Sequence, residues 1–287
     1  MISLGYVGFG VGLLALIAAS IFDIKTREVP DWLNFSLIAF VFGSSLVLSI
    51  YNGYPHIFFE AVLGLAVGLG IGLLMFYTGQ WGGGDSKLII GLAGLIGFSF
   101  SELSHGIPLF FIFVINILLA GAVYGLGFSI VKAIINFKNF REAAEKKLRS
   151  KGVLVIRVIL LVFAIGAFIF LLSTKSLEAA LLFGFALSLF LFFYLWAFVS
   201  VVEQVCMIRK IKLSQLTDGD WIVGDIVKNK KVILKPSKIG VTPKEIELLK
   251  KNKIREVTIK VGIPFVPSFL IAYLMTFILG NWLVLLI

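Results

Sequence analysis

Long uncharged hydrophobic runs, separated by short polar segments, occupy most of this chain. A helix needs about 20 apolar residues to cross a bilayer, and most of the runs have that length. The pattern predicts eight membrane spans, at about 3–22, 32–51, 57–78, 87–103, 108–131, 153–173, 178–202 and 263–287. The fourth is the weakest, because its uncharged stretch from Leu88 to Ser101 is also short enough for a re-entrant segment.

The composition excludes the soluble and the disordered classes of protein. Of the 287 residues, 59% are hydrophobic and 15% are charged, whereas an ordinary soluble domain has about 25% charged residues. The single cysteine, Cys206, excludes a disulfide framework and a multi-cysteine metal site, and two histidines leave little for a histidine-rich one. We therefore expect no metal ion and no cofactor.

The positive charge indicates how the chain is oriented in the membrane. If every span crosses, the loops 23–31, 79–87, 132–152 and 203–262 lie on one side and hold 24 of the 26 Lys and Arg residues. The positive-inside rule makes that side cytoplasmic, with both termini outside. Membrane lipids are the expected partners of these charges. Nucleic acid is not expected, because 203–262 has only one aromatic residue, Trp221, and no stacking pattern. The oligomeric state stays open.

The polar segment before the last span predicts a small cytoplasmic domain. Thr242 and Glu245 have capping-box spacing, with Pro243 at the first helical position, so a helix is expected from about 243 to 251. Alternating or β-branched stretches predict strands at 220–227, 230–235 and 255–261. The fold class is therefore an all-α polytopic membrane protein of about eight transmembrane helices, with a small α+β cytoplasmic domain inserted before the last helix.

Small and polar residues inside the spans predict close helix packing. Glycines repeat every four residues in three spans, which allows helix backbones to approach one another in lipid. We expect this packing to be intramolecular, and we expect Asn116 in the fifth span to form an interhelical hydrogen bond. The repeated glycines are Gly64, Gly68 and Gly72 in the third span, Gly8 and Gly12 in the first, and Gly121 and Gly125 in the fifth.

Two aspartates at the predicted cytoplasmic boundary are candidates for chemistry, because ionisable groups near membrane depth are costly. Asp23 ends the first span, and Asp85 begins the fourth after Gly82-Gly83-Gly84. Two adjacent carboxyls share a proton, so one can take a proton from water while the other polarises a peptide carbonyl. Glycines would give the loop positive φ angles and let a substrate strand come close.

Each residue also has a purely structural interpretation. Asp85 could cap a helix, and Asp23 could pair with Lys25 or Arg27. Asp31 follows Pro30 and is interpreted as a helix cap rather than as a catalytic group. Lys87, in the same loop as the glycines, could equally stabilise the ionised Asp85 or meet a lipid phosphate.

Together, these residues resemble the type IV prepilin peptidases, which are polytopic Gly-x-Gly-Asp aspartic proteases. The resemblance rests on Asp23-Ile-Lys-Thr-Arg27-Glu-Val-Pro30-Asp31 and on Gly82-Gly-Gly84-Asp85-Ser-Lys87, and it covers roughly residues 1–100. It implies that Asp23 and Asp85 are the catalytic pair. The cytoplasmic insert and Ile263-Pro-Phe-Val-Pro267 resemble the archaeal preflagellin and prepilin peptidase branch. The expected domains are a catalytic membrane core (1–131), a basic cytoplasmic loop with a helical C-terminal half (132–152), spans six and seven (153–202), the cytoplasmic domain (203–262) and the last helix (263–287).

The resemblance also implies a substrate, namely a precursor pilin or archaellin whose short basic leader is cut at the cytoplasmic face. Acidic residues exceed basic ones in the two candidate loops, so Glu28 and Asp31 are possible contacts for such a leader. Bacterial members of the family carry a Cys-x-x-Cys domain and also methylate the product. This chain has no such cysteines, so we expect cleavage without methylation.

Three other functions remain open. Another Gly-x-Gly-Asp intramembrane protease, of the signal-peptide-peptidase or presenilin type, would carry Pro-Ala-Leu and a Tyr before the first Asp. This chain has Phe22 there and no Pro-Ala-Leu. A transporter would place ionisable groups near the bilayer midplane, where the spans offer none. A scaffold without catalysis would tolerate Asp23→Asn.

Overall fold

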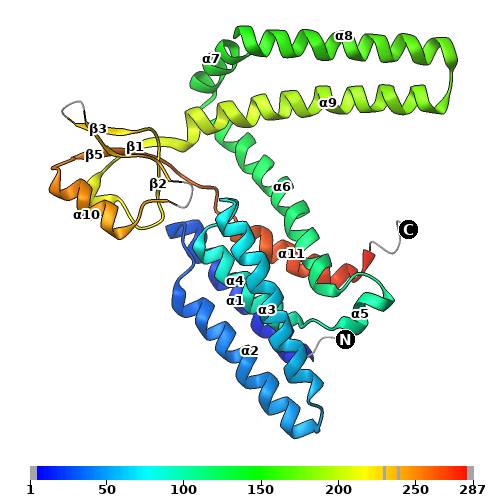
Figure 1. The fold of residues 1–287 in the computed structure, drawn as a ribbon, viewed down its shortest axis with the longest axis vertical. Helices are drawn as coiled ribbons and strands as arrows, with labels where there is room; N and C mark the ends of the chain where they lie inside the picture. Colours follow the sequence, from blue (N-terminus) through cyan, green and yellow to red (C-terminus); the bar gives the residue numbers. More distant parts are fainter. Residues whose placement is uncertain (1–4, 229–230, 238–239, 283–287) are drawn as a thin grey trace. The chain divides into compact units, whose positions relative to one another are not determined.

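The computed structural model describes residues 5–228, 231–237 and 240–282 and divides into two units (Figure 1). One unit contains Met1–Gly125 and Lys210–Ile287, and the other contains Leu126–Arg209. Each unit is described by itself below. The domain boundaries expected from the sequence stay a prediction.

The first unit is a helical bundle whose helices follow the predicted hydrophobic runs. The prediction of one helix at 87–103 is wrong, because two shorter helices replace it and the chain between them turns at Gly97, which has φ +78°. The helices are α1 (Gly5–Thr26), α2 (Asp31–Asn52), α3 (His56–Tyr77), α4 (Gly83–Ile96), α5 (Phe100–His105), α6 (Leu109–Ile135, which continues into the second unit) and α11 (Val266–Leu279).

The described helices support a multi-pass membrane protein. Six of them are long and apolar enough to cross a bilayer, namely α1, α2, α3, α6, α8 (Lys151–Thr174) and α9 (Leu177–Val202). Helices α4 and α11 have 14 residues each, which gives about 21 Å at 1.5 Å per residue and falls short of a hydrocarbon core of about 30 Å. Eight crossings therefore stay a prediction, and residues 283–287 of the last span lie outside the described residues.

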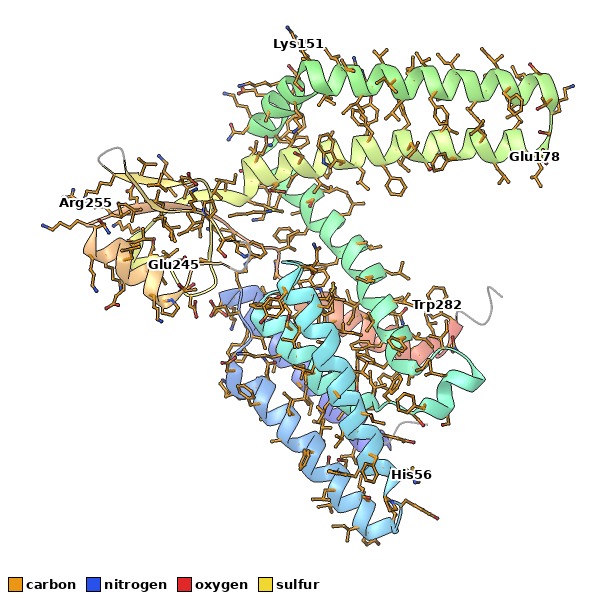
Figure 2. All side chains as sticks on the ribbon, in the orientation of Figure 1. His56, Lys151, Glu178, Glu245, Arg255 and Trp282 are labelled. Carbon is orange, nitrogen blue, oxygen red and sulfur yellow. The ribbon has the colours of Figure 1, made fainter. Side chains whose placement is uncertain are left out.

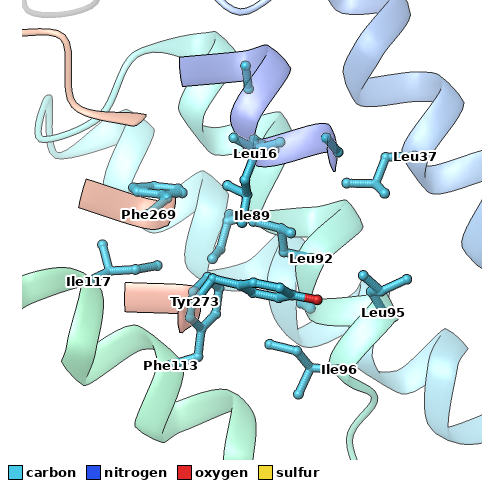
Figure 3. Close-up of a cluster of buried hydrophobic side chains, with 14 of the residues drawn as sticks. Leu16, Leu37, Ile89, Leu92, Leu95, Ile96, Phe113, Ile117, Phe269 and Tyr273 are labelled. Atoms are coloured by element: carbon cyan, nitrogen blue, oxygen red, sulfur yellow. The ribbon is translucent and has the colours of Figure 1, made fainter. Parts of the chain in front are cut away.

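Helix α4 is the buried centre of this bundle. Every residue from Leu88 to Ile96 except Ile90 is buried. Figure 3 shows its Ile89 and Leu92 among Leu16 of α1 and Phe269 and Tyr273 of α11. The packing depends on shape, because the surrounding helices approach α4 through small residues.

The predicted glycine-mediated packing is confirmed for α3. Gly64, Gly68 and Gly72 are its buried glycines, and all three face α4. A Cβ on Gly72 would lie 2.6 Å from the carbonyl oxygen of Ser86. Real Cβ atoms essentially never come so close to another heavy atom. Gly12 of α1 likewise faces Tyr273, whereas a Cβ on Gly125 would meet nothing within 4 Å.

Asn116 makes the predicted interhelical hydrogen bonds. It is fully buried in α6. Its Nδ2 donates to the hydroxyl of Thr276 in α11 at 2.9 Å, and its Oδ1 accepts from the indole N–H of Trp282 at 3.0 Å. These bonds fasten α6 to α11 inside the first unit.

A small α+β domain precedes α11, as expected. Helix α10 (Pro243–Lys251) has the predicted bounds, and its capping box forms, with the Thr242 hydroxyl accepting from the Glu245 N–H at 3.4 Å. The predicted single strand at 220–227 is wrong. Gly224 has φ +77° and divides the segment into two strands of different sheets, and a basic first strand was not predicted. One sheet has the order β1 (Ile208–Lys212), β5 (Glu256–Lys260), β2 (Trp221–Ile222), and the other pairs β3 (Ile226–Lys228) with β4 (Lys231–Leu234) antiparallel.

The second unit is a helical hairpin that begins with an amphipathic helix. Helix α7 (Phe137–Leu148) confirms the expected helix in the basic loop, and α8 and α9 match the predicted sixth and seventh spans. Figure 2 shows Lys151 and Glu178 at opposite ends of the hairpin. The two buried residues of α8 are Val153 and Ala167, and Phe168 of α8 packs against Phe183 of α9 with 5.3 Å between ring centroids.

Gly72→Ala should destabilise the bundle, because a methyl group would press on the backbone of α4 at Ser86. Overpacking of this kind costs about 1–3 kcal/mol. Gly70→Ala is the matched control on the same helix, since a Cβ there meets nothing within 4 Å. Thermal unfolding in detergent micelles should show a lower midpoint for Gly72→Ala alone. Equal midpoints for the two variants would contradict the packing described for α3 and α4.

Candidate active site

Asp23 sits in the last turn of α1 and is buried, with 5% of its surface exposed. The helix ends at Thr26, and the N–H of the next residue, Arg27, donates to the carbonyl of Asp23 at 2.9 Å. Arg27 has φ +64°, the left-handed conformation that commonly ends a helix. The Asp23 carboxylate turns inward, and its Oδ2 accepts a hydrogen bond from the N–H of Val266 at 2.8 Å.

Asp85 is the third residue of α4, beside the N-terminal end of that helix. Its Oδ2 accepts a long hydrogen bond from the N–H of Gly82, the capping residue, at 3.4 Å. Asp85 therefore has a capping contact, as its structural interpretation expects. It also lies within electrostatic range of Asp23. The fold thus brings together the two carboxyls that the sequence singled out, and one role does not exclude the other.

The glycine loop acts differently from the expectation. Positive φ angles were predicted for Gly82, Gly83 and Gly84, but Gly82 has φ −70° and none of the three is among the described glycines with positive φ. The constraint is at Gly84, where a Cβ would lie 3.0 Å from the backbone nitrogen of Val29. Gly84 is therefore needed for the close approach of the loop after α1 to the start of α4. A Cβ on Gly83 would meet its nearest atom, on Phe76, at 3.8 Å.

Asp31 and Lys87 are partners of each other. The Lys87 Nζ lies 2.6 Å from Asp31 Oδ1, and 5.5 Å from the ring centroid of Phe35. The interpretation of Asp31 as a helix cap needs correction. Asp31 is the first residue of α2 and makes no capping hydrogen bond, because Pro30 holds the cap position. Lys87 pairs with Asp31 of α2, and its contact with lipid stays a prediction. The pair is exposed, so it contributes at most about 1 kcal/mol.

Glu28 interacts with the small α+β domain. Partial burial raises the pKa of its carboxyl, and the nearby Asp220 and Asp218 carboxylates raise it further, while a hydrogen bond with the Thr217 side chain offsets part of this rise. Asp220 itself accepts from the Thr217 N–H at 2.8 Å, so this turn of the domain is held in shape. Glu28 is thus already surrounded by carboxylates of the folded chain.

Four residues at the site were not singled out from the sequence. Asn34 of α2 is fully buried and donates from Nδ2 to the carbonyl of Gly84 at 3.2 Å. Trp81, just before the glycine loop, packs on Phe269 at 5.0 Å between ring centroids. Tyr124 of α6 lies within electrostatic range of Asp23, and Val266 binds Asp23 directly. Asn34 could have been found, because a polar residue inside an uncharged span usually has a partner.

The part of the chain that carries both aspartates is similar to known proteins. Residues 10–126 match the type IV leader peptidase family. A preflagellin peptidase from Methanocaldococcus jannaschii is 38% identical over 97 residues, which are 31% of this chain and 38% of that protein. The preflagellin peptidase of Methanococcus voltae is 34% identical over 107 residues, which are 36% of this chain and 45% of that protein. One from Methanococcus maripaludis is 34% identical over 90 residues, which are 30% and 37% of the two chains.

These matches confirm the resemblance to leader peptidases found in the sequence. They span less than half the length of each curated relative. The leader peptidase match contains Asp23, Asp85 and Gly82–Gly84, and it ends at the first residue of the second unit, before the small α+β domain and α11. The contact between Asp23 and Val266 therefore joins the matched segment to a part of the chain beyond it.

Gly84→Ala should disturb the site, whereas Gly83→Ala should not. The methyl group at position 84 would push against the backbone of Val29, while position 83 has room. We expect thermal unfolding of Gly84→Ala in micelles to begin at a lower temperature, with a loss of about 1–3 kcal/mol. Limited proteolysis at 26–30 should also become faster in this variant. If Gly83→Ala were the more damaging change, the described contact would be wrong.

Glu28→Gln should change how stability depends on pH. The raised pKa means that the folded protein binds the proton of Glu28 more readily than the unfolded chain, whose carboxyl has the ordinary value of 4.5. Wild type should therefore gain stability relative to Glu28→Gln as the pH falls toward 4.5, the ordinary pKa of the carboxyl. Denaturation curves at several pH values measure this difference. Glu247→Gln, at an exposed position of α10, is the control and should track wild type.

Proposed function

We propose that this protein is an integral-membrane aspartic endopeptidase that removes the short basic leader of pilin-like or archaellin precursors. One observation carries the proposal: two aspartates from different helices, α1 and α4, lie within electrostatic range of each other inside the segment that matches the leader peptidase family. The curated relatives named preflagellin peptidase supply the substrate class. The six long apolar helices support a multi-pass membrane protein.

In the proposed mechanism, Asp23 and Asp85 share one proton and hold a water molecule. The ionised carboxylate takes a proton from the water, and the water oxygen attacks the carbonyl carbon of the scissile peptide. The protonated carboxyl donates a hydrogen bond to the carbonyl oxygen, where negative charge develops. Collapse of the tetrahedral intermediate returns a proton to the leaving amine. No residue needs to become covalently attached to the substrate.

We further propose that this chemistry takes place at the cytoplasmic face of the membrane. The support is the charge distribution, since 24 of the 26 Lys and Arg residues fall in loops that eight crossings would place on that side. In this topology α4, with α5, would make the fourth crossing, and α11 would lead into the last one. A precursor helix in the bilayer would then present its leader beside Asp23 and Asp85.

Glu28 and Asp31 are proposed contacts for the basic leader, with different strengths. The carboxylates of Asp218 and Asp220 around Glu28 make its surroundings attractive to a cation. Asp31 already pairs with Lys87, so a leader lysine would have to compete for it. Membrane lipids are the other proposed partners, through the basic loops.

Asp23→Asn and Asp85→Asn should each abolish cleavage in a membrane assay with a panel of archaellin and pilin precursors. The expected loss is at least about a hundredfold, the lower range for removing an acid or base. Asp225→Asn, on an exposed carboxylate of the cytoplasmic domain, should cleave like wild type. A precursor whose leader lysines are replaced by glutamine should be cut more slowly.

The outcomes separate the competing functions. Cleavage that survives either Asn substitution removes that aspartate from the mechanism. If folded wild type cleaves no precursor but does cleave transmembrane signal-peptide remnants, another Gly-x-Gly-Asp protease function replaces the proposal. If it cleaves neither substrate, a transporter or scaffold function replaces the proposal.

A further inference from the structure

The short segment Gly262–Val266, between β5 and α11, contacts the end of α1 at two points. The N–H of Val266 donates to Asp23 Oδ2 at 2.8 Å, in a buried hydrogen bond. The carbonyl of Gly262 accepts from Arg27 Nη1 at 2.6 Å. The segment lies more than a hundred residues beyond the region that matches leader peptidases. Its role therefore follows from the tertiary structure alone.

The Val266 N–H is well suited to hold a carboxylate. Val266 is the first residue of α11, so its N–H has no partner within the helix. The helix dipole also favours negative charge at this end. The length of 2.8 Å falls in the range of charge-assisted hydrogen bonds, whereas the bond from Gly82 to Asp85 is 3.4 Å long. The hydrogen bond to Asp23 therefore stabilises a negative charge more than the hydrogen bond to Asp85 does.

The segment is itself held firmly in place. Pro264 and Pro267 restrict the backbone on either side of Val266, whose side chain is fully buried. The Phe265 ring packs on Trp81, with 6.5 Å between centroids, and Trp81 directly precedes the glycine loop of Asp85. The same segment is thus fixed to the elements that carry both aspartates.

We propose that Val266 is a positioning residue whose backbone N–H orients Asp23 and keeps it ionised. This inference rests on the proposed function and assigns a role to each member of the dyad. Asp23 is the base that takes the proton from water, and Asp85 holds the shared proton and donates to the peptide carbonyl. The titratable groups that face Asp23 are Arg27 from its own helix end, Asp85 from α4 and Tyr124 from α6.

The test removes one hydrogen and leaves every side chain in place. In the full-length protein, Val266 is replaced by α-hydroxyisovaleric acid, which exchanges its N–H for an ester oxygen. We expect kcat for precursor cleavage to fall about tenfold to a hundredfold, the effect of losing a hydrogen bond to a charged group. The acidic limb of the kcat–pH profile should move up by about one pH unit, because Asp23 has lost a donor that favours its ionised form. KM should change little.

Two controls separate positioning from general stability. Val266→Ala keeps the N–H and should keep the acidic limb of wild type, even if thermal stability falls. Lactic acid in place of Ala272, a buried residue inside α11, removes a helical N–H away from the site and should also leave the limb unchanged. If the ester at 266 does not fold, Val266→Pro removes the same N–H at a helix position that accepts proline, and it should move the limb in the same direction.

A second readout does not depend on cleavage. In pH-difference infrared spectra, the carboxylate band that Asp23→Asn removes should appear at a higher pH in the ester variant than in wild type. An unchanged band and an unchanged acidic limb would overturn the role of Val266 while leaving the peptidase function intact. Failure of wild type to cleave any precursor would overturn the function, and the infrared titration would still decide whether Val266 acts on Asp23.

Discussion

The packing of α4 against glycine surfaces is the constraint on which the rest of the first unit depends. This helix is buried along almost its whole length, so its position is set by contacts on every side. Gly64, Gly68 and Gly72 let the backbone of α3 reach it, and Gly91 and Gly94 make room on α4 for side chains of α2 and α3. In lipid, apolar contact alone gives little preference for one helix partner, so shape decides the arrangement.

The same packing determines where Asp85 lies. Asp85 is at the N-terminal end of α4, and Gly84 brings that end against Val29, in the loop that follows α1. Asn34 of α2 adds a hydrogen bond to the Gly84 carbonyl. Helix packing therefore places Asp23 and Asp85 near each other, even though two carboxylates repel. That arrangement leaves Asp23 within electrostatic range of both Arg27 and Asp85.

The segment after the small α+β domain completes the surroundings of Asp23. The chain leaves β5, binds Arg27 through Gly262, binds Asp23 through Val266 and continues as α11 into the bundle core. Glu28, in the next turn of chain, meets Thr217 and Asp220 of the same domain. The loop after α1 is thus held by the helical bundle on one side and by the small α+β domain on the other.

The sequence by itself determined the membrane class, most helices and helix α10, and it singled out Asp23, Asp85 and the three glycines before Asp85 as candidates, because hydropathy, capping chemistry and motif spacing are local properties. It placed one helix at 87–103 and one strand at 220–227, where single glycines divide the chain. It could not pair Asp31 with Lys87 or separate Gly84 from Gly83, since both depend on which helices adjoin. Only the tertiary structure put Val266 on Asp23, because no local signal links two residues that are 243 positions apart in the chain.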